Sequence, residues 1–202
     1  MRGYRSIKTS PKVRSGRQYR AESAVPQKGD FNAVRDEPKV FRKNPGPYHR
    51  HVLHVRHVRE FVAILPQWAE LSEGLNTILL ARHVHGCDGF HRAGLVAICA
   101  QPRSLCWVVE DQGYVDEHAT LLRRLNVSMQ STPEGTELRF AEGSLRAFQL
   151  LHVLLHELGH HHDRMTTRSR RRASRGESFA ERYANEHAGM IWDRYHELAE
   201  SW

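Results

Sequence analysis

The sequence predicts an α+β fold in which a helix and several short strands precede two long helices. Short apolar runs rich in Val, Ile and Leu, bounded by Gly or Pro, predict strands in the middle of the chain. Apolar residues at helical spacing predict the two long helices, over residues 145–162 and 177–198. At 202 residues, the chain has the length expected of one domain.

The elements before the two long helices follow from the same patterns. Residues 54–68 predict a helix that stops near Pro66, because apolar side chains recur there at helical spacing. The remaining predictions, in chain order, are strands at 75–81, 94–100 and 105–109, a helix at 116–125 and a strand at 136–140.

Basic residues are concentrated at the N-terminus. Residues 1–50 hold 13 Lys and Arg against 4 Asp and Glu, whereas the whole chain has a net charge of +7. The same segment lacks apolar periodicity and contains five of the eight Pro residues. We therefore expect a disordered basic tail over residues 1–48 and a folded domain over residues 49–202. Such a tail can contact nucleic acid or an acidic partner.

The sequence also indicates a soluble, cytoplasmic protein. No stretch approaches the ~20 apolar residues of a membrane span, and the N-terminus lacks the apolar region of a secretory signal. The three cysteines, Cys87, Cys99 and Cys106, form no CxxC pair and leave an odd one over. This pattern favours reduced thiols and therefore a reducing compartment.

Residues 156–160 read His-Glu-Leu-Gly-His inside an apolar stretch with helical spacing. Positions four apart lie on one face of a helix, so His156 and His160 can offer two imidazoles to one cation. Glu157 lies one residue round the helix, where it can hold a metal-bound water without ligating the metal. The pattern predicts a zinc site in which Glu157 is the general base of a hydrolase.

The residues around this motif decide whether it indicates a metal site, because a chain with 15 His can produce the pattern by chance. Ser144 is the expected N-cap, and Gly159 is the only Gly or Pro between Leu145 and His162. Apolar residues flank the motif on several faces, which predicts a buried helix. Buried His and Glu side chains need partners. A metal ion is one such partner; the alternative is a pair of core histidines satisfied within the protein.

A catalytic zinc site also needs a third protein ligand. The metzincin pattern would place a His six residues after His160, but that residue is Thr166. Glu177 and Glu181 open the next predicted helix, on the face that otherwise carries Ala, Ile, Tyr and Leu. We expect one of these two carboxylates to be the third ligand. The alternative is an ordinary helix start, where the helix dipole favours acidic residues.

Together, the HELGH motif at 156–160 and the ESFAERYA stretch at 177–184 resemble the gluzincin group of zinc metallopeptidases. The likeness is to small single-domain members, and the Phe-Ala-Glu stretch is similar to the catalytic domain of anthrax lethal factor. The resemblance implies Zn²⁺ held by His156, His160 and Glu177, with Glu181 supporting a ligand His. A second alignment, on Glu181-x-x-Ala-Asn185, resembles small regulatory metallopeptidases and would make Glu181 the ligand.

The resemblance also implies a fold and an activity. The fold would be zincin-like, with a small, mostly antiparallel sheet packed on the two metal-site helices. Its edge strand, at 94–100 or 136–140, would pair with an extended substrate. The activity would be hydrolysis of peptide bonds in a protein or peptide, with Glu157 passing a proton from water to the leaving amine. The alternative is a regulatory or nucleic-acid-associated protein that uses the fold for one partner or lacks catalysis.

Two further segments carry ligand-binding residue types. The first is rich in metal-ligand side chains but has no strand or helix period, so the sequence leaves its metal binding open. Its members are His83, His85, Cys87, Asp88 and His91. The second segment, between Arg164 and Arg175, holds six Arg and would overhang the zinc. There it can favour acidic peptides or bind nucleic acid.

Overall fold

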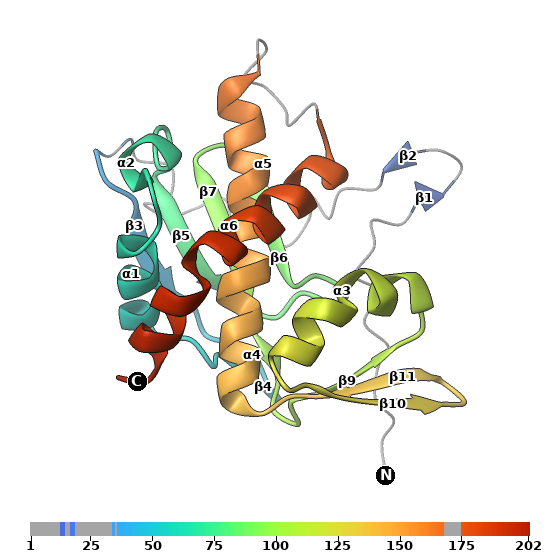
Figure 1. The fold of residues 1–202 in the computed structure, drawn as a ribbon. Helices are drawn as coiled ribbons and strands as arrows, with labels where there is room; N and C mark the ends of the chain where they lie inside the picture. The colour runs from blue at the N-terminus through green and yellow to red at the C-terminus, as the bar shows by residue number, and fades with distance from the viewer. Residues whose placement is uncertain (1–12, 15–16, 19–33, 35, 168–174) are drawn as a thin grey trace.

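Figure 1 shows the computed structural model, which describes residues 13–14, 17–18, 34, 36–167 and 175–202. Within these residues the fold is α+β, with helices packed against a mixed sheet and a second, smaller sheet nearby. Most of the predicted basic tail, at 1–12, 15–16, 19–33 and 35, lies outside the described residues. Residues 168–174 of the Arg-rich segment lie outside them as well.

Four strands form the main sheet, in the order β3-β5-β7-β6. Their bounds are Lys39–Arg42 for β3, Thr77–Ala81 for β5, Leu95–Cys99 for β7 and Gly89–Arg92 for β6. β3 and β7 run parallel to β5, and β6 runs antiparallel to β7. The expectation of a mostly antiparallel sheet is therefore wrong for this sheet. Every residue of β5 and β7 is buried, as is usual for parallel strands covered on both faces.

Two strands of this sheet lie where the sequence predicted none. β3 pairs with β5 although its residues were assigned to the basic tail, so the folded domain begins before residue 49. β6 lies in the His-rich segment, which showed no strand or helix period because four residues are too few for an alternating pattern. Since β7 lies between β5 and β6, the expected edge strand at 94–100 is an inner strand, and β6 is the edge.

The second sheet is antiparallel, in the order β10-β11-β9. Its strands are β9 (Cys106–Val109), β10 (Ser128–Thr132) and β11 (Gly135–Arg139). β11 is the central strand, so the other expected edge, at 136–140, is not an edge either. Two short antiparallel pairs are also present: β4 (His49–Arg50) with β8 (Gln101–Pro102), and β1 (Val13–Arg14) with β2 (Arg17–Gln18).

The helices before the motif are α1 (Val55–Ala63), α2 (Trp68–Leu71) and α3 (Gln112–Arg124). α1 confirms the helix predicted at 54–68, although it ends before Pro66. α3 begins four residues earlier than predicted. The reason is Asp111, whose carboxylate caps the helix by accepting the N–H of Gly113 at 2.9 Å.

One long helix runs through the core, and α6 (Glu177–Ala199) crosses it (Figure 1). The long helix consists of α4 (Glu142–Phe148), a π-helical segment at Gln149–Leu154, called here the π segment, and α5 (Leu155–Thr166). Ala141 is the N-cap residue of this helix, without a side-chain hydrogen bond. The predicted N-cap, Ser144, lies inside the helix and donates to the Ala141 carbonyl. Every residue of the π segment is buried, which confirms the predicted burial. No helix of the described residues has the length and apolar character needed to span a membrane.

Candidate metal centre

Three of the predicted ligands meet where α5 and α6 cross. His156 and His160 come from α5, and Glu177 from the first turn of α6. Glu177 Oε2 lies 3.1 Å from His156 Nε2 and 3.4 Å from His160 Nε2. The two imidazole side chains are mostly buried, whereas that of Glu177 is 48% exposed. The site therefore opens to solvent on the Glu177 side.

The close crossing of the two helices depends on Gly159, the small residue within the motif. A Cβ at this position would lie 2.9 Å from Ala180 Cα and 3.1 Å from Tyr183 Cβ. Contacts of this length with helix backbone cannot relax by moving a flexible side chain. A glycine between the two motif histidines thus lets α6 approach closely enough to bring its first turn over them.

The start of α6 is held by Asp163, which is fully buried. Its carboxylate accepts the backbone N–H of Arg175 at 2.8 Å and that of Gly176 at 3.3 Å, and the Arg175 guanidinium at 2.8 Å. These contacts fix the residues immediately before Glu177 and so position that carboxylate.

Glu177 and Glu181 lie on opposite sides of the His156 ring. Glu181 Oε2 lies 3.2 Å from His156 Nδ1, on the opposite side of the ring from the Nε2 that faces Glu177. A metal-binding histidine commonly donates its second ring N–H to a carboxylate, which orients the ring. Among the described residues, Glu177 is grouped with both motif histidines, and Glu181 is not part of that group.

The charges at the centre are strongly coupled. Burial alone lowers the pKa of His156, but its hydrogen bonds to Glu177 and Glu181 outweigh burial and raise it to about 10. Hydrogen bonds from His156 and His160 hold the pKa of Glu177 well below its usual range. Burial raises the pKa of Glu181, but the hydrogen bond from His156 and the nearby charges of His152, His118 and His156 together outweigh burial and lower it to about 2. The site thus stabilises positive charge between two carboxylates.

Comparison of the chain with protein-family models, with curated proteins and with solved structures finds no match. The resemblance to gluzincins therefore remains a matter of motif and spacing. Any assignment of function depends on the geometry of the described residues.

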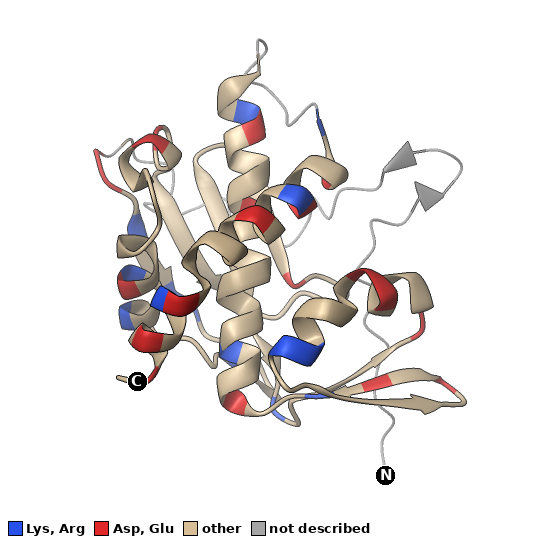
Figure 2. Cartoon of the chain, in the orientation of Figure 1, with Lys and Arg blue, Asp and Glu red and all other residues tan. Residues whose placement is uncertain are grey.

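The donor set fits zinc. Two imidazole nitrogens and one carboxylate oxygen, all within 4.8 Å of one another, match the three protein ligands of catalytic zinc sites. Calcium and magnesium, in contrast, prefer oxygen ligands. The long helix carries no Lys or Arg between Arg146 and Arg164 (Figure 2). Among the described residues, the ion-pair partners of Glu177 are histidines. A bound cation would replace the proton that otherwise lies between these groups.

Glu157 lies on the buried side of α5, towards β6. Its side chain packs closely on Gly89, where a Cβ would lie 2.9 Å from Glu157 Cγ. Burial raises the pKa of Glu157 to about 7, and the nearby His156 and His160 oppose this rise. A carboxyl group of this kind can exchange a proton near neutral pH, as a general acid and base must.

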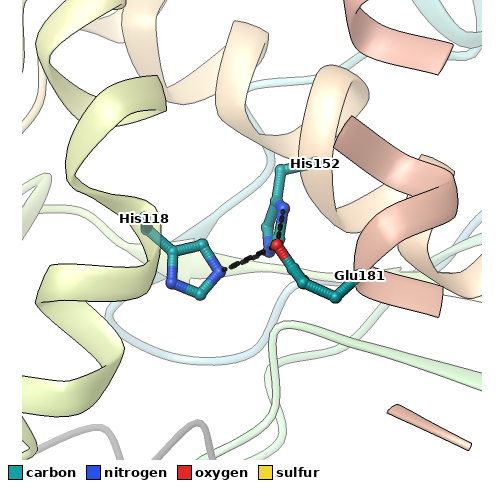
Figure 3. Close-up of side chains that lie close together, drawn as sticks. All are labelled: His118, His152 and Glu181. Atoms are coloured by element: carbon teal, nitrogen blue, oxygen red, sulfur yellow. Dashed lines mark hydrogen bonds and ion pairs between the residues drawn. The ribbon is translucent and has the colours of Figure 1, made fainter. Parts of the chain in front are cut away.

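Two histidines near the centre were not assigned a role from the sequence. His152 precedes His156 by four residues and so lies one turn earlier on the same face of the long helix. His118 comes from α3 and was not considered, because nothing in the sequence places α3 beside the motif helix. In the structure, His118 Nε2 lies 2.9 Å from His152 Nε2, and both rings lie close to Glu181 (Figure 3).

The His-rich segment before and within β6 is not gathered into a candidate group of metal ligands among the described residues. Within the described residues, its members appear in neither group of at least three candidate ligands. Several of them have other contacts: His83 Nδ1 lies 3.1 Å from the Ala100 carbonyl, Cys87 donates to the Gly89 carbonyl, and Asp88 accepts from Gln101. The contacts of His83 and Asp88 hold the segment against Ala100 and Gln101, where β7 is followed by β8.

Proposed function

We propose that the protein is a zinc-dependent peptidase of zincin-like fold. The observation that carries this proposal is the convergence of His156, His160 and Glu177 beside the buried Glu157. The three ligand atoms lie within 4.8 Å of one another, and one side of the group faces solvent. Catalytic zinc sites differ from structural ones in that they keep a coordination position open in this way.

The residues have distinct roles in the proposed reaction. His156 and His160 would hold the zinc through Nε2 and Glu177 through its carboxylate. When bound, zinc supplies a Lewis acid that polarises a carbonyl and makes a water molecule more acidic. Glu157 accepts the proton of the attacking water and delivers it to the leaving amine. Glu181 keeps the His156 ring in place through Nδ1.

The edge strand β6 is the proposed binding surface for substrate. It is the terminal strand of the main sheet, and it packs against α5 beside Glu157. An extended peptide can add to a sheet edge through main-chain hydrogen bonds, which suits a peptidase that must hold a backbone of varied sequence. Gly89, the first residue of β6, would bring such a backbone next to the proposed base.

Metal removal and reconstitution of the purified full-length protein test this function. Zinc content and cleavage of a mixed peptide library are measured as purified, after chelation, and after addition of Zn²⁺ or Mg²⁺. We expect cleavage to disappear with the metal and to return with Zn²⁺ but not with Mg²⁺. Cleavage that persists without metal, or a protein that binds no zinc, would overturn the proposal.

A further inference from the structure

A second group of metal-binding side chains lies one helical turn from the first. It consists of His118 from α3, His152 from the π segment and Glu181 from α6 (Figure 3). One ligand atom of each residue lies within 4.8 Å of the others. His118 and His152 are buried, with 6% and 7% exposure. Three elements distant in sequence thus bring polar groups together in the interior.

The hydrogen bonding of His118 leaves one ring nitrogen directed at this group. His118 Nδ1 lies 2.7 Å from the Tyr114 carbonyl, which can only accept, so Nδ1 carries the hydrogen. In the neutral ring, Nε2 is then an acceptor, and it faces His152 and Glu181. A ring that donates one N–H to a backbone carbonyl and presents the other nitrogen is the usual arrangement of a metal ligand.

The two oxygens of the Glu181 carboxylate face different histidines. Oε2 is paired with His156 Nδ1, and Oε1 lies 3.8 Å from His152 Nδ1 and 3.9 Å from His118 Nε2. These two distances are too long for hydrogen bonds. Oε1 accepts one hydrogen bond from the exposed Asn185 amide, at 3.2 Å. The carboxylate therefore has a lone pair available towards the two histidines.

Hydrogen bonding alone does not satisfy the group. Because His118 Nε2 is an acceptor, the 2.9 Å contact requires His152 to donate from Nε2. In the neutral ring, His152 Nδ1 is then a second acceptor, and it faces the Glu181 oxygen with no proton between them. Two acceptors that face one another with no proton between them are unfavourable. A cation between the three residues removes this mismatch.

We propose that His118, His152 and Glu181 form a second, buried site for a divalent transition-metal ion such as zinc. Two imidazoles and a carboxylate are the ligand types that zinc takes, and they do not suit calcium or magnesium. The site links α3 to the crossing of the long helix with α6, and it shares Glu181 with the support of His156. Its role is structural, so it does not depend on peptide hydrolysis.

Metal stoichiometry of the full-length protein tests this site. The protein is equilibrated with Zn²⁺ and freed of excess, and the bound zinc is counted per chain. We expect two zinc ions in the wild type, one in His118→Asn and one in His160→Asn. The control is His187→Asn, since His187 contacts Tyr183 and belongs to neither group; it should keep both ions. Substitution with Co²⁺ should give two separable absorption spectra, one of which is missing in His118→Asn.

The outcomes separate this proposal from the proposed activity. A wild type with one zinc, lost in His160→Asn and kept in His118→Asn, would overturn the second site and leave the peptidase proposal intact. Two bound ions without peptide cleavage would support the second site and contradict the peptidase. A wild type without zinc would overturn both. The wild-type count decides the question even if His118→Asn does not fold.

Discussion

Glu181 Oε2 lies 3.2 Å from Nδ1 of His156, the ring nitrogen opposite the one that faces Glu177. One imidazole is thus held between two carboxylates from successive turns of α6. The two carboxylates differ in position, since Glu177 also approaches His160 and Glu181 does not. The two sequence alignments, which disagreed on the third ligand, can therefore be separated by experiment.

Glu177→Gln and Glu181→Gln are expected to weaken zinc binding at the His156–His160 centre to different degrees. Glu177→Gln removes a charged ligand, so this centre should lose its zinc. Glu181→Gln leaves the three ligands in place and removes their support, so affinity there should fall by about 10–100-fold. Competition with a chromogenic chelator measures both affinities. Glu181 also belongs to the proposed second site, so its substitution affects both bound ions. The zinc ion at the His156–His160 centre is therefore identified as the one that is absent from His160→Asn. Stronger loss in Glu181→Gln would favour the other alignment.

Glu157→Gln is expected to separate metal binding from catalysis. The substituted side chain has nearly the same size in its buried position and is not a ligand, so zinc content should match the wild type. Without a proton acceptor, kcat/KM for peptide cleavage should fall by about 10²–10⁴-fold, the usual contribution of a general base. Zinc content and cleavage are measured on the same preparation. An active Glu157→Gln variant would assign the base to another residue.

The motif helices were predictable from the sequence because their patterns are long. Helical spacing over many residues indicated α5, α6 and their buried faces, and the four-residue interval placed His156 and His160 together. The shorter elements gave less information. β6 has four residues, and β3 lies among Pro and charged residues, so neither carries a pattern that separates it from a loop.

The rest of the site depends on contacts between distant segments. His118 lies 34 residues before His152, and only the packing of α3 beside the long helix brings the two rings together. The different positions of Glu177 and Glu181 depend on how α6 is rotated and how closely it crosses α5. Gly159 and Asp163 set this crossing, and their partners cannot be read from local spacing.

Gly159→Ala is expected to destabilise the protein and weaken zinc binding. Alanine favours helix by about 1 kcal/mol over glycine, but its Cβ would lie 2.9 Å from the Ala180 backbone. To relieve this contact the two packed helices must separate, which lowers the free energy of unfolding by about 1–3 kcal/mol, more than the helix propensity gains. The separation also moves Glu177 away from the histidines. Urea unfolding of the zinc-free protein and zinc affinity measure the two effects.

The matched control is Gly189→Ala, in the exposed middle of α6. A Cβ there meets nothing within 4 Å, so the same substitution should stabilise the protein by up to about 1 kcal/mol. Opposite signs for the two variants would assign the effect at Gly159 to the helix crossing. If both variants are stabilised, the close approach of α6 to α5 is not required.

Asp163→Asn is expected to loosen the start of α6. The buried carboxylate accepts three N–H groups, from the backbone of Arg175 and Gly176 and from the Arg175 side chain. An amide cannot accept all three, and losing a hydrogen bond to a charged group costs about 1.5–3 kcal/mol. The variant should unfold at lower urea and bind zinc more weakly, because Glu177 directly follows this anchor. Arg175→Ala is the control: it leaves the backbone contacts in place, removes a side chain that is 42% exposed together with its stacking on Phe179, and should cost about 1 kcal/mol. Equal losses in the two variants would show that the ion pair, rather than the backbone contacts, fixes the helix start.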